Sequence, residues 1–181
     1  MPMSKQLIIK AQSDIDACFK IIRDSAQRAH AHICQVADSG HPLDFLYQMK
    51  FTEIGCDPMD SNRRLNLIEQ LNQTFTYVAS LKAASYLLQS RPSFDTLTLN
   101  LGTAPGWDIE SAENGGLVAE VFAAVNPKNN RKLNNDMKKV AEEKVQHRYV
   151  FFMCPGIGPG PYRERLIPQG INVVSLGCDV P

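Results

Sequence analysis

The sequence predicts an α/β protein, in which a mixed β-sheet carries helices on both faces and follows an N-terminal helical extension. Three observations favour this class. Apolar residues recur at helical spacing over most of the first 90 residues, and they alternate every second residue between 95 and 101. Three consecutive strands are then followed by a helix and further strands, an order that makes strand pairing both antiparallel and parallel. The chain of 181 residues suits one domain with an added arm. We expect the extension to cover residues 1–57 and the α/β core to cover 58–181.

Three helices are predicted in the first half of the chain. The first begins at Ser13 and ends before the turn cluster at 38–42, and a short second helix covers 42–50. The third runs from 62 to about 88. One side of this helix is apolar and the other is polar but weakly charged, a pattern typical of a helix that faces a site or another polar surface.

Strands dominate the second half. Residues 95–101 alternate as a half-buried strand does, and 107–111 form a second short strand. The sequence ENGG predicts a tight hairpin turn before a longer strand at 117–125. After the break at NPKNN, the apolar side of a helix is marked by Leu133, Met137, Val140 and Ala141. The remaining predicted elements include this helix at 130–145 and two buried strands, at 148–153 and 171–176.

The composition is that of a globular protein in a reducing compartment. Lys plus Arg and Asp plus Glu both total 19, so the net charge is zero, which argues against a protein that coats nucleic acid by bulk charge. The five cysteines include no C-x-x-C pair, so neither a disulfide framework nor a zinc knuckle is expected. The N-terminus is too short and polar for a signal peptide, and we expect a cytoplasmic protein.

Two carboxylates do not fit a strand built only for a core. One face of 117–125 is wholly apolar, and Glu120 lies on the other face. The hairpin would bring Asp108, on the neighbouring strand, close to Glu120. Burying two adjacent carboxylates without partners costs several kcal/mol. A divalent cation with oxygen ligands would offset that cost, clamp a phosphodiester and activate a water molecule.

The same spacing also has a purely structural explanation. Glu120 would then form a salt bridge with Arg131, Lys132 or Arg148, and Asp108 would simply occupy a turn. The spacing alone leaves both explanations open.

The order of elements, together with these carboxylates, resembles the PD-(D/E)XK nuclease superfamily, which has the restriction-endonuclease-like fold. Its αβββαβ core carries an Asp on the second strand and a Glu two residues before a Lys on the third. Asp108 in GWDIE matches the Asp, and Glu120 in AEVF matches the Glu. Glu69 lies in the long helix, where the family often has another acid. The resemblance covers roughly residues 60 to 176.

The resemblance implies a Mg²⁺-dependent DNA endonuclease of the restriction or mobile-element type, acting as a homodimer. Asp108 and Glu120 would hold the metal, and Glu69 would support it directly or through water. The sequence departs from the motif at the lysine, because Phe122 stands at that position.

Two hypotheses follow from this departure. In the first, Lys128 or Lys132 replaces the missing lysine and the protein cuts DNA. In the second, the protein is a catalytically inactive module of the same fold that binds DNA or serves in assembly.

The segment that follows the third core strand is locally basic. Asn129, Asn130 and Arg131 lie beside the expected site, and we expect them to contact nucleic acid. Lys138, Lys139 and Lys144 are interpreted as part of a solvated charged face.

Overall fold

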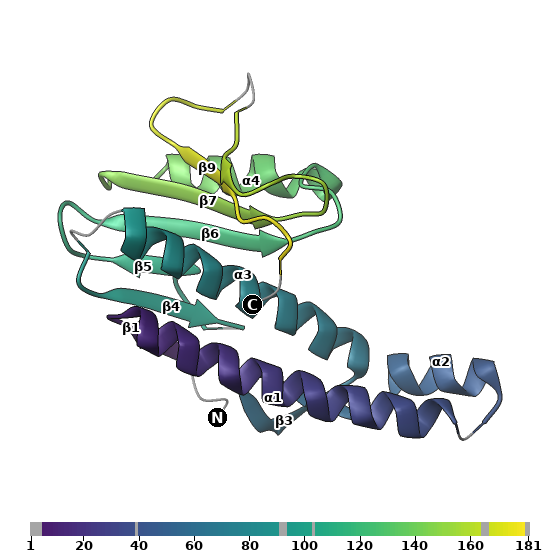
Figure 1. Ribbon diagram of the computed structural model, residues 1–181. Helices are drawn as coiled ribbons and strands as arrows, with labels where there is room; N and C mark the ends of the chain where they lie inside the picture. Colours follow the sequence, from purple (N-terminus) through teal and green to yellow (C-terminus); the bar gives the residue numbers. More distant parts are fainter. Residues whose placement is uncertain (1–4, 39, 91–93, 103, 164–166, 180–181) are drawn as a thin grey trace. The chain divides into compact units, whose positions relative to one another are not determined.

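The structure is a computed structural model that describes residues 5–38, 40–90, 94–102, 104–163 and 167–179 (Figure 1). It is a mixed α/β protein, which confirms the predicted class, with a seven-stranded mixed sheet, a separate two-stranded sheet and four α-helices in the described residues. The chain divides into two compact units. One consists of Met1–Ile15 and Ala79–Pro181, and the other of Asp16–Val78.

The seven-stranded sheet belongs to the first unit. Its strands, in spatial order, are β1 (Lys5–Ile9), β4 (Leu97–Leu101), β5 (Ile109–Ser111), β6 (Leu117–Ala123), β7 (His147–Met153), β9 (Asn172–Ser175) and β8 (Gly160–Pro161). The pairs from β1 to β6 are antiparallel, whereas β6–β7 and β7–β9 are parallel. β1 was not predicted, because its sequence KQLII is short and a helix follows at once.

Helix α4 (Lys132–Ala141) covers one face of this sheet. A 3₁₀ turn, η1 (Asn129–Arg131), leads into it from β6. Leu133, Met137 and Val140 are buried as predicted, and they pack in one cluster with strand residues such as Val118 and Phe122. Ala141 was expected on the same side but is exposed at the last position of the helix. The helix was expected to continue to residue 145, but it ends at Ala141.

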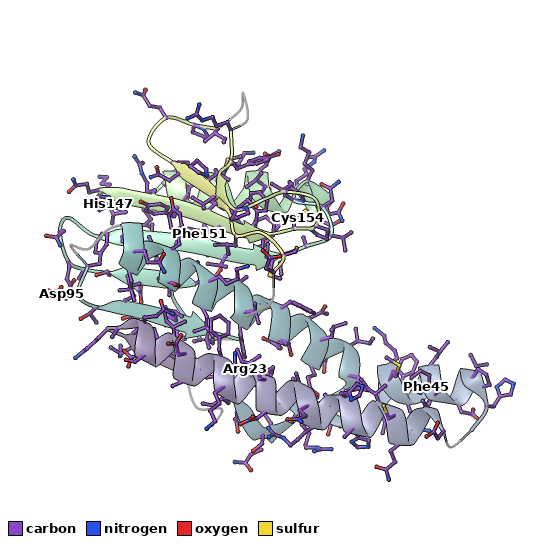
Figure 2. All side chains as sticks on the ribbon, viewed as in Figure 1. Arg23, Phe45, Asp95, His147, Phe151 and Cys154 are labelled. Carbon is purple, nitrogen blue, oxygen red and sulfur yellow. The ribbon has the colours of Figure 1, made fainter. Side chains whose placement is uncertain are left out.

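The second half of α3 (Leu67–Ser90) lies in the same unit, and its Tyr86 packs on the other face of the sheet. The ring of Tyr86 contacts Phe151 of β7 edge-on, with ring centres 5.5 Å apart, and Tyr149 stacks on Phe151 at 5.2 Å. Figure 2 labels Phe151 in the central part of the sheet. Because β6 and β7 lie between two covered faces, almost every residue in them is buried, as in strands of parallel sheets.

The Asp16–Val78 unit holds most of α1 (Gln12–Ala37), α2 (Pro42–Phe51) and the two-stranded sheet of β2 (Gly55–Asp57) and β3 (Asp60–Leu65). The predicted third helix begins at Leu67 rather than at 62, because residues 60–65 pair with β2. Buried Asp57 accepts hydrogen bonds from Tyr77 Oη at 3.0 Å and from Arg63 Nη1 at 3.1 Å. No helix in the described part of the chain is both long and apolar enough to cross a membrane.

Candidate functional site

Asp108 is positioned by a tight turn before β5. Gly106 has a φ of 112°, which favours glycine, and a Cβ there would lie 2.7 Å from the Asn100 amide nitrogen. Asn100 Nδ2 donates to Trp107 O at 2.7 Å, and Asn100 N donates to Asp108 O at 3.0 Å. Oδ2 of Asp108 accepts a hydrogen bond from Val121 N of β6 at 2.7 Å. The Asp108 carboxylate is therefore tied to the main chain of the strand that carries Glu120.

Glu120 lies in the middle of β6 and is only 5% exposed. It shares its face of the strand with Val118 and Phe122, which pack beneath α4. Its Oε1 forms an ion pair with Nζ of Lys139, a residue of α4. The same ammonium lies 4.5 Å from the centre of the Trp107 ring, within the range of a cation–π interaction. Lys139 thus joins the helix, the strand and the turn before β5.

A second pair of charges on α4 lies beside the first. Lys132 Nζ donates to Oδ1 of buried Asp136 at 2.9 Å and lies 5.8 Å from the centre of the Phe122 ring. Burial raises the pKa of Asp136, and its Oδ2 has no hydrogen-bond partner among the described residues. Burial opposes the charged form of Lys132, but the hydrogen bond and charge of Asp136, with the charges of Glu120 and Asp108, raise the pKa of this lysine.

The acidic pair itself is electrostatically strained. Burial and the charge of Glu120 raise the pKa of Asp108 from 3.8 to about 6. The Val121 hydrogen bond and the charges of Lys132 and Lys139 act in the opposite direction. We call Asp108, Glu120, Asp136, Lys132 and Lys139 the carboxylate–lysine cluster. Its formal charge is negative, because three acids face two lysines.

The cluster contains two residues that sequence reasoning missed. Asp136 was not singled out, and Lys139 was interpreted as part of a solvated face, although its side chain is about half exposed and contacts Glu120. The available signal was spacing, since Lys132, Asp136 and Lys139 follow one another at i, i+4 and i+7 on one helix face. The sequence suggested Arg131, Lys132 or Arg148 as the salt-bridge partner of Glu120. In the structure the partner is Lys139.

The other predicted site residues are exposed. Lys128, Asn129, Asn130 and Arg131 are exposed in the turn between β6 and α4, where Asn130 and Arg131 have left-handed φ values of 51° and 55°. Glu69 is exposed in the first turn of α3, within the Asp16–Val78 unit. The roles expected for these residues stay predictions.

The described residues contain no group of three or more His, Cys, Asp and Glu side chains placed to hold a metal ion. Mg²⁺ does not need such a group, because it commonly takes one or two protein carboxylates and completes its coordination with water and substrate oxygens. Asp108 and Glu120 would supply two.

Comparisons with protein-family models, with curated proteins and with solved structures find no match to this chain.

Proposed function

We propose that the chain is a Mg²⁺-dependent endonuclease of DNA with a restriction-endonuclease-like core. The observation that carries the proposal is the pair of carboxylates Asp108, which is partly buried directly before β5, and Glu120, which is buried in β6, with the ammonium group of Lys139 from α4 in contact with Glu120. The order α3, β4, β5, β6, α4, β7 supports it, because that order is the αβββαβ order of the resemblance. The directions of the four strands support the proposal as well. β4, β6 and β7 run in the same direction, and β5 is antiparallel to its two neighbours.

The charges of the cluster suit a divalent cation. Burial and the charge of Glu120 oppose the ionised form of Asp108 and raise its pKa, and Asp136 keeps one buried oxygen without a partner among the described residues. A cation at Asp108 and Glu120 would favour the ionised form of both. When bound, Mg²⁺ would polarise a phosphodiester and lower the pKa of a coordinated water.

The lysines of α4 would take the role of the family lysine. Phe122 fills the motif position with a buried ring, so no charge can act from there. Lys139 contacts Glu120 directly, and the charge of Lys132 acts on Asp108. An ammonium group held at this place would stabilise negative charge that develops on a phosphate. Lys139 is the stronger candidate, because the Trp107 ring and Glu120 fix its Nζ from two sides.

The turn between β6 and α4 would contact the DNA backbone. Its side chains at Asn129, Asn130 and Arg131 are exposed, and two of these residues hold left-handed conformations. Uncommon backbone conformations of this kind concentrate at functional sites. Amide and guanidinium groups are common donors to phosphate oxygens.

Metal binding is the first test. Calorimetric titration with Mg²⁺ and with Mn²⁺ should give heat of binding for the wild-type protein, and Glu120→Ala should abolish it. Glu142→Ala is the matched control, since Glu142 is an exposed carboxylate at the end of α4 and should bind metal as wild type does. A wild-type protein that binds neither ion would overturn the proposal.

Cleavage is the second test. Linearisation of a supercoiled plasmid in Mg²⁺ should slow about 10²- to 10³-fold in Lys139→Met, the size of effect seen when one charge-stabilising donor is removed. Lys138→Met is the control, because Lys138 is exposed and stands one position away on the same helix. If both variants cut as wild type does, Lys139 has no catalytic role.

The second candidate function is an inactive nuclease-fold protein that binds DNA or serves in assembly. Phe122 at the motif position, together with a Glu120 already paired with a lysine, favours it. DNA retained in a mobility-shift assay, with the plasmid intact and no metal bound, would select this candidate.

A further inference from the structure

Helix α2 is apolar on two sides. Phe45, which Figure 2 labels, and Met49 lie one turn apart on one side of the helix and are both half-buried. The opposite side carries four large apolar side chains that are between 57% and 68% exposed, which we call the outer stripe: Leu43, Leu46, Tyr47 and Phe51. These positions follow one another at i, i+3, i+4 and i+8, the spacing of a buried helix face. None of the ten residues of α2, all of which are described, is buried.

The exposure of the outer stripe is unusual for a helix of this length. An isolated helix shorter than about 12 residues is marginal in water and depends on the packing of its apolar faces. The start of α2 is well formed, since Pro42 follows His41, whose Nδ1 accepts from Leu43 N at 3.2 Å. At its other end the rings of Tyr47 and Phe51 lie 5.1 Å apart. The helix is therefore built to present these side chains in a fixed array.

The area of the outer stripe matches a small protein interface. Aromatic side chains offer roughly 150–250 Å² each and leucines somewhat less, so these four at their exposure present on the order of 500 Å². Two copies placed face to face would bury roughly 1,000 Å², the lower limit for a specific interface. Contiguous apolar patches of this size on a surface mark interaction sites.

The charges of α2 indicate which partner fits. Asp44 lies in its first turn and Lys50 in its last turn. In an antiparallel pair of α2 helices, the acidic end of each lies beside the basic end of the other, and the helix dipoles oppose. A two-fold axis makes one patch complementary to itself, which an apolar stripe with an acidic and a basic end satisfies. A parallel pair would bring like charges together.

We propose that the outer stripe of α2 is the surface by which two copies of this chain associate, with their α2 helices antiparallel across a two-fold axis. The inference rests on the surface of α2 alone and does not depend on the carboxylate–lysine cluster.

Sedimentation velocity on the whole chain, from about 1 to about 200 µM, tests the proposal. An interface at the lower size limit belongs to the weak, transient class, so we expect the monomer–dimer equilibrium of the wild-type chain to fall within this concentration range. Leu46→Glu should weaken association at least about 100-fold, because it places two like charges at the centre of the contact. Val125→Glu introduces the same charge at an apolar residue that is 80% exposed in the other unit, and it should dimerise as wild type does. Circular dichroism of both variants checks that they remain folded.

A charge exchange provides a test that leaves the apolar residues untouched. Asp44→Lys alone should weaken the dimer, since it faces Lys50 of the other copy, and adding Lys50→Asp should restore the affinity. A chain that stays monomeric at every concentration, or a dimer indifferent to Leu46→Glu, overturns the proposal and leaves the stripe to a different protein or a lipid surface. A dimer in which the double exchange fails to restore the affinity overturns the antiparallel arrangement.

Discussion

Replacing Asp108 with asparagine should stabilise this protein at pH 8, although the change removes a charge from the candidate site. Asparagine has the same shape as a protonated aspartic acid, and its side-chain oxygen can still accept the hydrogen bond from Val121 N. The substitution therefore removes the ionisation of Asp108 with little change in packing. In a protein without metal, that ionisation opposes folding.

The size of the effect follows from the pKa of Asp108. Its pKa rises from 3.8 to about 6 on folding, so the folded state holds the proton more tightly than the unfolded chain does. Stability from this group is thus full below pH 3.8, falls as the pH rises to about 6, and is constant above. With about 1.4 kcal/mol for each pKa unit, the ionised carboxylate costs the folded state about 3 kcal/mol at pH 8. Near pH 4, where the carboxylate is mostly protonated in the folded state, the same calculation gives a cost of only about 0.5 kcal/mol.

Urea unfolding of wild type and Asp108→Asn, in EDTA at both pH values, measures the difference. We expect the variant to be more stable by about 2–3 kcal/mol at pH 8 and nearly equal to wild type at pH 4. Glu142→Gln is the control, since that exposed carboxylate should give no pH-dependent difference. A variant less stable than wild type at pH 8, or a difference that does not change with pH, would refute the reasoning.

Two further predictions concern buried groups. Phe122→Lys restores the residue of the family motif, but Phe122 is buried in a cluster with Met137, so the change should lower the free energy of unfolding by about 3–5 kcal/mol. Urea unfolding tests this, and a loss below about 1 kcal/mol would show that the position tolerates a lysine. Tyr77→Phe removes the hydroxyl that donates to Asp57, a wholly buried carboxylate, and should destabilise the protein by about 1–3 kcal/mol; a calorimetric melting temperature equal to that of wild type would contradict it.

The parts of the fold that the sequence predicted are those with a strong apolar signal. β6 and β7 were expected because nearly every residue in them is apolar, and α4 because Leu133, Met137 and Val140 repeat at helical spacing. The hairpin of β2 and β3 escaped prediction, since the β3 sequence DSNRRL is polar and lies against the start of a long helix. Its pairing depends on contacts across the chain, such as the bonds to Asp57, that no local pattern contains.

In the candidate site, too, the sequence predicted one part and missed another. The hairpin was enough to predict that Asp108 would lie near Glu120, because β5 and β6 pair with Ile109 opposite Ala119 and the two acids come next along the two chains. Charge spacing on α4 could not tell which lysine would reach Glu120. That choice depends on how the helix rotates when its apolar side packs on the sheet, and this packing placed Lys139 at the acid and Lys132 at Asp136.

The hydrogen bond from Val121 N to Asp108 has a consequence for how such a site can change. It fixes the spacing of the two acids through the backbone of β6, so that spacing is independent of the side chains above it. The lysines stand on a separate element, α4, whose apolar side packs on the sheet and whose Lys139 forms an ion pair with Glu120. Substitutions on α4 can therefore exchange one cationic group for another while the spacing of the acids stays constant, and the position of the lysine is the part of the motif that is free to move.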